Sequence, residues 1–134
     1  MEKLQEYPVL IREIHLDFMG HVNNATYLEL FEEARWQVIF ERGYGLNEIR
    51  KSGKGPVILE VNLKYLKEIH LRDQITITTE ISSYEGKIGK MTQKMMTNEG
   101  ECAAVAEFTF GLFDLHARKL ISPTPEWKRA IGLE

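Results

Sequence analysis

Residues 25–42 carry the strongest pattern in the sequence, because their apolar side chains recur with the period of an α-helix. Five of them fall at positions i, i+3, i+4, i+7 and i+11: Tyr27, Leu30, Phe31, Ala34 and Val38. This spacing places them on one face of a helix. Asn23 or Asn24 suits the helix start, and Gly43 or Gly45 suits its end. We expect one helix, roughly 27 Å long, and its wide apolar stripe indicates that the helix is largely buried.

The rest of the chain shows the shorter period of extended strands. Stretches rich in β-branched or alternating apolar residues predict strands over 7–16, 57–67, 73–84, 88–98 and 102–116. A short helix or turn is expected over 46–51. Glycine-containing breaks at 84–87 and 98–101 predict hairpins, and therefore mostly antiparallel strands. The tail around Trp127 is expected either to pack back or to fray.

This order of elements predicts the α+β class, in which a curved antiparallel sheet wraps around one long central helix. With 134 residues, the chain is expected to form one domain over residues 1–134. Such a sheet has two exposed edges, and proteins usually pair or cover long edges. We therefore expect a homo-oligomer joined edge to edge.

The charge balance excludes several classes of partner. There are 17 basic and 20 acidic residues, so the net charge is −3, which argues against nucleic-acid binding.

The N-terminal residues lack an apolar leader, and no stretch approaches the ~20 apolar residues that span a membrane. The single cysteine, Cys102, is expected to be a structural thiol in a reduced, cytoplasmic setting.

The segment before the helix contains the residues best suited to catalysis. Asp17 lies just ahead of a helix start, where free N–H groups favour negative charge. A carboxylate beside such donors suits thioester hydrolysis, which needs an activated water or nucleophile and stabilisation of an oxyanion. Alternatively, Asp17 only holds the loop by hydrogen bonds. His21 is either an acid–base group or a partner for loop backbone.

Other candidate groups are given structural interpretations. His15, Asp17 and His21 are residue types that bind zinc or iron, but no fourth ligand stands out, so neither a metal nor a cofactor is expected. Three helical acids, Glu29, Glu32 and Glu33, are expected at the surface or an interface, with Glu32 paired to Arg35. His70 and His116 have no partner visible in the sequence and are expected to be surface histidines.

The run from Asp17 to Trp36, DFMGHVNNATYLELFEEARW, resembles the signature of hotdog-fold acyl-CoA thioesterases of the 4-hydroxybenzoyl-CoA thioesterase type. Within that group it is most similar to the bacterial long-chain acyl-CoA thioesterase III branch. The similarity continues through Tyr65, Asp73 and residues 86–90. One departure is Glu68, which stands where the family commonly has a proline.

This resemblance implies a hotdog fold, a homodimer or homotetramer, and hydrolysis of a fatty acyl-CoA to free acid and coenzyme A. The family's catalytic aspartate corresponds to Asp17, and its oxyanion-binding backbone N–H to Asn24. We add His21 as a catalytic candidate. The residues expected to bind substrate are Asn23, Tyr27, Lys64, Tyr65, Lys87 and Lys90. Two alternatives are a non-catalytic acyl-CoA or fatty-acid binding module and an enoyl-CoA hydratase or dehydratase of the same fold.

Overall fold

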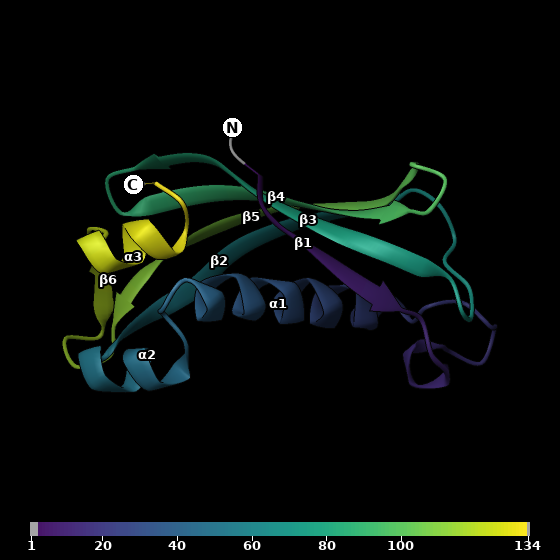
Figure 1. The fold of residues 1–134 in the computed structure, drawn as a ribbon. Helices are drawn as coiled ribbons and strands as arrows, with labels where there is room; N and C mark the ends of the chain where they lie inside the picture. The colour runs from purple at the N-terminus through teal and green to yellow at the C-terminus, as the bar shows by residue number, and fades with distance from the viewer. Residues whose placement is uncertain (1–2, 134) are drawn as a thin grey trace.

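The computed structural model describes residues 3–133 and confirms the expected α+β hotdog architecture over that range. A six-stranded antiparallel sheet arches over the central helix α1 (Figure 1). The path order of its strands is β1-β3-β4-β5-β2, and β6 pairs with β5. The strands are β1 (Lys3–Leu10), β2 (Lys54–Tyr65), β3 (Gln74–Glu85), β4 (Ile88–Thr97), β5 (Cys102–Asp114) and β6 (Lys119–Ile121). The helices are α1 (Asn24–Glu41), α2 (Leu46–Ser52) and α3 (Pro125–Ala130).

Helix α1 begins and ends as its sequence predicts, but it is less buried. Asn23 caps the start, because its side chain accepts the N–H of Ala25. Gly43 follows the helix end with a φ of +83°, a conformation that glycine adopts without strain. The predicted stripe faces the sheet: Tyr27, Leu30, Phe31, Ala34 and Val38 are buried, as is Ile39. The expectation of a largely buried helix is wrong for this chain alone, because Trp36 and Phe40 stay exposed.

The predicted first strand, 7–16, is displaced, because β1 begins earlier, at Lys3, and also ends earlier. Strand β1 ends at Leu10, and a 3₁₀ turn occupies Glu13–His15. The ring nitrogen Nδ1 of His15 accepts the backbone N–H of Arg12 at 2.9 Å, which folds the chain back on itself. The apolar pattern did not reveal this turn, because a side chain bonded to the main chain holds it.

The four later predicted strands and both hairpins are confirmed, with small shifts at their ends. β3 pairs with β4 and β4 with β5, each antiparallel. The connecting turns contain Gly86 and Gly100, both with positive φ. Ile75, Ile77 and Ile81 are buried under the sheet, as the alternation in β3 indicates.

The C-terminal tail packs back rather than frays, and it contains two elements that the sequence analysis missed. Short strand β6 extends the sheet beside β5, and α3 follows it. Trp127 on α3 is buried, and its ring N–H donates to the hydroxyl of Tyr84 at 3.2 Å. Its ring also lies 5.3 Å from that of Tyr44. The tail thereby closes one end of the core.

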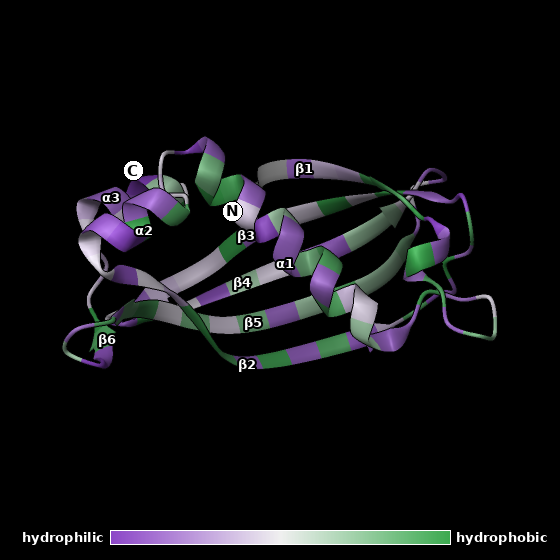
Figure 2. Ribbon diagram, turned by 90° about the horizontal axis from the view of Figure 1, so that it is seen from below, coloured by the Kyte–Doolittle hydropathy of each residue, from purple (hydrophilic) through white to green (hydrophobic). Residues whose placement is uncertain are grey.

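Strand β2 forms one edge of the sheet, as Figure 2 shows. Among the described strands it pairs only with β5. Three apolar side chains on this twelve-residue strand remain exposed: Ile58, Leu59 and Val61. An apolar strand with one unpaired side is a surface suited to pairing with another strand.

None of the helices described here is long and apolar enough to cross a membrane.

Candidate active site

Asp17 holds a tight turn between the 3₁₀ turn and helix α1. Its Oδ1 accepts the backbone N–H of Met19 at 2.9 Å and that of His21 at 3.3 Å. The backbone of Asp17 also pairs with that of His21, since its N–H donates to the His21 carbonyl at 2.8 Å. Both side-chain bonds end on Oδ1, so neither occupies Oδ2. Asp17 therefore holds the loop by hydrogen bonds through Oδ1, and these bonds leave its other carboxylate oxygen available.

The start of α1 provides the hydrogen-bond donors. Asn23 accepts the Ala25 N–H through its side chain at 2.9 Å and the Thr26 N–H through its carbonyl at 2.9 Å. Asn24 is the first helical residue. Within the part of the chain that the structure describes, its backbone N–H donates no hydrogen bond. An unused N–H at a helix start is a donor for an anion. Asn23 and Asn24 thus take different positions, cap and first turn.

Two tyrosines, Tyr65 and Tyr27, lie at this helix start and contact each other. The hydroxyl of Tyr65, at the end of β2, donates to the backbone carbonyl of Asn24 at 3.0 Å. The rings of Tyr65 and Tyr27 meet edge to face, with centroids 4.9 Å apart. Burial raises the pKa of Tyr27, and the nearby Tyr65, Glu68 and Asp17 raise it further. Four of the residues expected at the site, Asp17, Asn24, Tyr27 and Tyr65, therefore lie together.

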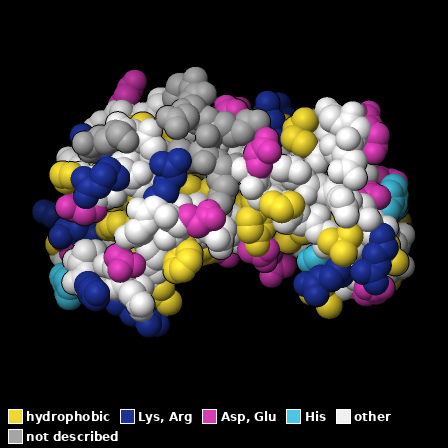
Figure 3. Space-filling view, in the orientation of Figure 1, with side chains coloured by type: hydrophobic (Ala, Val, Ile, Leu, Met, Phe, Trp, Pro, Cys, Tyr) yellow, Lys and Arg dark blue, Asp and Glu magenta, His cyan; other side chains and the backbone are white. Residues whose placement is uncertain are grey.

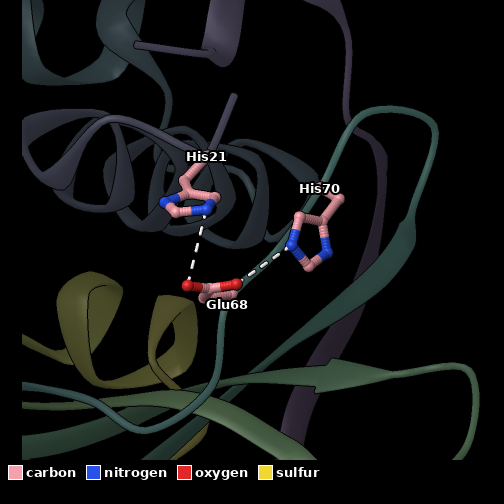
Figure 4. A group of neighbouring side chains, drawn as sticks. All are labelled: His21, Glu68 and His70. Carbon is pink, nitrogen blue, oxygen red and sulfur yellow. Dashed lines mark hydrogen bonds and ion pairs between the residues drawn. The ribbon is translucent and has the colours of Figure 1, made fainter. Parts of the chain in front are cut away.

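His21 joins a cluster that the sequence analysis did not predict (Figure 4). Its Nε2 lies 3.4 Å from one carboxylate oxygen of Glu68, and the Nε2 of His70 lies 3.2 Å from the other. His70 is exposed, as expected, and it has partners that are not visible in the sequence: besides Glu68, it contacts Asp73, which accepts its backbone N–H at 2.8 Å. No sequence pattern linked these residues, because an isolated backbone bridge between His21 and His70 joins the two loops.

The metal set considered from sequence does not assemble. His15 is buried and its Nδ1 is engaged by the Arg12 N–H, while the Oδ1 of Asp17 serves the turn. The group whose ligand atoms do come together is His21, Glu68 and His70, within 4.8 Å of one another.

The three lysines expected to bind substrate are divided between two ends of the molecule. Lys64 lies next to Tyr65, at the end of the sheet that carries the α1 start. Lys87 and Lys90 lie at the β3–β4 hairpin, at the opposite end (Figure 1). Lys90 pairs with Ser83, nine residues along β3 from Gln74, so it lies roughly 30 Å from the start of that strand. Lys64 lies nearer to Lys90, since the two pair with Val105 and Thr109, four residues or roughly 13 Å apart along β5. Lys and Arg side chains gather at both ends in Figure 3, with a hollow between them at the lower edge. One copy of the chain does not bring Lys87 or Lys90 to Asp17.

A cavity lies between α1 and the sheet. Its volume is about 100 Å³, and its wall is mainly apolar. The lining residues include Glu32, Arg35, Trp36, Ile81, Phe110 and Trp127. An apolar cavity of about 150 Å³ holds one benzene ring, so this one is too small for a long acyl chain as it stands.

Arg35 sits on a polar network beneath α1 that the sequence analysis also missed. Its Nη1 donates to Oε1 of Gln93 at 3.1 Å, and its guanidinium lies 4.5 Å from the centre of the Phe108 ring. Burial lowers the pKa of Arg35 to about 10, partly offset by Glu32. Fully buried Gln93 donates in turn to the Phe31 carbonyl at 3.1 Å and to Thr79 at 3.0 Å. These bonds join the helix to the inner face of the sheet.

The three helical glutamates Glu29, Glu32 and Glu33 are exposed, as expected for surface acids. Glu33 accepts a short hydrogen bond from the hydroxyl of Tyr7 on β1. Glu29 is exposed, and Glu32 lies at the cavity beside Arg35.

Comparison with known proteins settles the family. Residues 9–131 match the family described as the thioesterase-like superfamily. The chain belongs to this superfamily. This thioesterase-like chain is accordingly an enzyme, a thioester hydrolase, as the resemblance in the Asp17–Trp36 segment implied.

Two curated relatives cover most of the thioesterase-like chain. The long-chain acyl-CoA thioesterase FadM of Escherichia coli K12 is 34% identical over 115 residues, which span 85% of this chain and 86% of FadM. The acyl-CoA thioester hydrolase YbgC of Escherichia coli O157:H7 is 25% identical over 104 residues, 78% of each chain.

Solved structures share the thioesterase-like fold. YbaW, a probable thioesterase from Escherichia coli, superposes with a TM-score of 0.84 at 30% identity, covering 96% of each chain. SAV2348 from Staphylococcus aureus, solved in complex with CoA, has a TM-score of 0.90 at 20% identity and covers 98% of this chain and 82% of its own. Because SAV2348 is only 20% identical to this chain, its similarity shows a shared fold and nothing more.

Proposed function

We propose that this protein is an acyl-CoA thioesterase that hydrolyses a fatty acyl-CoA to free acid and coenzyme A. The observation that carries the proposal is that one short segment carries both the Asp17 carboxylate, which keeps one oxygen outside the turn, and an unused Asn24 N–H at the start of α1. The 34% identity to a long-chain acyl-CoA thioesterase supports the substrate class.

In this proposal the two groups divide the chemistry. The Asn24 N–H donates to the thioester oxygen and stabilises the negative charge that develops on it. The free Oδ2 of Asp17 either removes a proton from the attacking water or attacks the carbonyl itself. The thiolate is a good leaving group and needs no strong acid. His21 lies on the same turn, where its ring is held by Glu68 rather than by Asp17.

A second copy of the chain would complete the site. We infer that β2 pairs antiparallel with β2 of another copy, because its free edge is twelve residues long and apolar. Antiparallel pairing sets the Tyr65 end of one strand beside the Lys54 end of the other. The pairings Lys54↔Asp114 and Gly89↔Phe110 put the β3–β4 hairpin at the Lys54 end of the sheet. Lys87 and Lys90 of the partner subunit would then lie at the Asp17 end, where they would bind CoA phosphates.

A panel of acyl-CoA substrates with a thiol-reactive dye tests the activity. We expect release of free thiol, and a loss of about 100-fold or more in kcat for Asp17→Asn. Asp114→Asn is the matched control, because Oδ1 of Asp114 also accepts two backbone N–H groups of a turn, from His116 and Ala117. Asparagine retains that acceptor oxygen in both variants, so only the loss of charge at Asp17 should affect hydrolysis.

Two outcomes would overturn the proposal. Thermal stabilisation by acyl-CoA without thiol release would indicate a binding module. A change in enoyl-CoA absorbance without thiol release would indicate a hydratase or dehydratase. Equal activity of Asp17→Asn and Asp114→Asn would remove Asp17 from the mechanism.

A further inference from the structure

We propose that His21, Glu68 and His70 form a binding site for a divalent transition-metal ion of the zinc class. The two ring nitrogens lie on opposite oxygens of one carboxylate, at 3.4 Å and 3.2 Å (Figure 4). Zinc binds such atoms at about 2.0–2.2 Å, so two ligands of a tetrahedral ion lie roughly 3.3 Å apart. The two N–O spacings already present therefore match the spacing that an ion requires, and all three ligand atoms lie within 4.8 Å of one another.

The backbone fixes both histidines in this arrangement. His21 and His70 form an antiparallel bridge, which brings the turn before α1 against the loop that precedes β3. Their rings meet edge to face, with centroids 5.6 Å apart, so both project to the same side. The site does not depend on one mobile loop, because each histidine belongs to a different segment.

A second carboxylate supports the metal-binding orientation of His70. Oδ2 of Asp73 accepts the His70 backbone N–H at 2.8 Å and lies 3.8 Å from its Nδ1. At 3.8 Å the carboxylate acts on Nδ1 through its charge rather than through a hydrogen bond, and that charge favours a proton on Nδ1, which leaves the other nitrogen free to bind a metal. Here the other nitrogen is the Nε2 that faces Glu68.

Exposure and ligand type select the kind of ion. The side chains are 35%, 62% and 54% exposed for His21, Glu68 and His70, so water has access to complete the coordination. Two imidazoles with one carboxylate suit zinc, nickel or copper, whereas magnesium and calcium prefer oxygen ligands alone. Ion pairs between groups this exposed contribute little by themselves, so exchanging them for metal bonds costs little.

Binding would fasten the turn that carries Asp17 to the loop before β3. The turn already depends on Oδ1 of Asp17, which accepts the His21 N–H. An ion held by His21 and His70 would add a link across the same two segments and stabilise the folded state. The site does not depend on the proposed hydrolysis, and binding is measurable without substrate.

Calorimetric titration of the chelator-treated, full-length protein with zinc chloride tests the proposal. We expect one equivalent to bind, and the Tm to rise by about 5 °C at a zinc concentration ten times the Kd. Glu68→Gln and His70→Asn should each weaken the affinity at least tenfold. His116→Asn is the matched control, because His116 is an exposed histidine outside the cluster, and it should bind zinc as the wild type does.

Several results would overturn the proposal. One is zinc affinity that survives intact in the Glu68→Gln, His70→Asn double variant. Another is binding that disappears in Cys102→Ser, since the ion would then sit at the thiol. Circular dichroism checks that each variant is folded. In zinc-soaked crystals of the wild type, an anomalous peak between the two Nε2 atoms would support the site independently of any substitution, and a peak elsewhere would contradict it.

Discussion

Tyr65 at the end of β2 donates its hydroxyl to the backbone carbonyl of Asn24, the first residue of α1, at 3.0 Å. The bond joins the free edge of the sheet to the helix start whose N–H groups are proposed to bind the oxyanion. The position of the donor is thus set partly by a residue 41 positions away along the chain.

Tyr65→Phe should lower kcat by about 3- to 10-fold, because the helix start loses one hydrogen bond worth about 1 kcal/mol. Thiol-release kinetics measure this effect. Tyr84→Phe is the control, since the Tyr84 hydroxyl bonds Trp127 at the other end of the core. Equal losses of kcat in the two variants would mean that the Asn24 contact has no special role.

If β2 pairs with β2 of a second copy as proposed, Val61→Lys should yield a monomer of 15.5 kDa, because it places a charge within the apolar edge of β2. Light scattering after size-exclusion chromatography gives the mass directly. Leu10→Lys on β1, the opposite edge of the sheet, is the control; Leu10 is 42% exposed and Val61 40%. If Leu10→Lys dissociates the protein and Val61→Lys does not, the interface lies on β1.

Gln93→Met should lower the free energy of unfolding by about 3 kcal/mol. The substitution removes the side-chain partners of Arg35, Thr79 and the Phe31 carbonyl while the site stays filled. Urea denaturation measures the change. Lys94→Met alters the next, exposed residue and should shift stability by no more than about 0.5 kcal/mol. If Gln93→Met leaves the free energy of unfolding unchanged, this network adds no stability.

Tyr7 should make stability depend on pH in the alkaline range. The hydrogen bond to Glu33 raises its pKa to about 12, with burial and the Glu33 charge adding to the effect. The unfolded value is about 10, so the stabilisation is fully present below pH 10 and is lost as the pH rises through 12. The difference in unfolding free energy between wild type and Tyr7→Phe should therefore shrink over that range.

Ultraviolet titration of the phenolate provides the check on Tyr7. Glu33→Gln keeps an acceptor but removes the charge, and should move the late titration step toward pH 10. If the wild type shows no tyrosine titrating later than the unfolded chain, the Glu33 bond does not hold the Tyr7 proton.

Local patterns in the sequence predicted the elements whose structure is decided locally. The stripe from Tyr27 to Val38 marks α1 because its buried face repeats with the helix itself, and Ile75, Ile77 and Ile81 mark β3 in the same way. The 3₁₀ turn at His15 escaped because one side-chain bond decides it. The position of helix α3 depends on Trp127, which packs against Tyr44 and donates a hydrogen bond to Tyr84, both far away in the sequence.

The same distinction between local and long-range determinants applies to the residues of the candidate site. Asp17 and Asn24 lie in one continuous segment, and its resemblance to a known signature placed them together. Glu68 and His70 reach His21 only through a backbone bridge between separate loops, which no spacing in the sequence expresses. Lys87 and Lys90 were grouped with the site by charge alone, and β3 carries them to the far end of the same copy.

The cavity under α1 also gives this protein two optical reporters. Trp36 and Trp127, the two tryptophans of the chain, both line it, yet Trp36 is 40% exposed and Trp127 is 2% exposed. Their fluorescence should therefore differ in wavelength and in sensitivity to aqueous quenchers such as iodide. A small apolar ligand entering the cavity would shield Trp36 and leave Trp127 nearly unchanged, so ligand entry can be followed without a label.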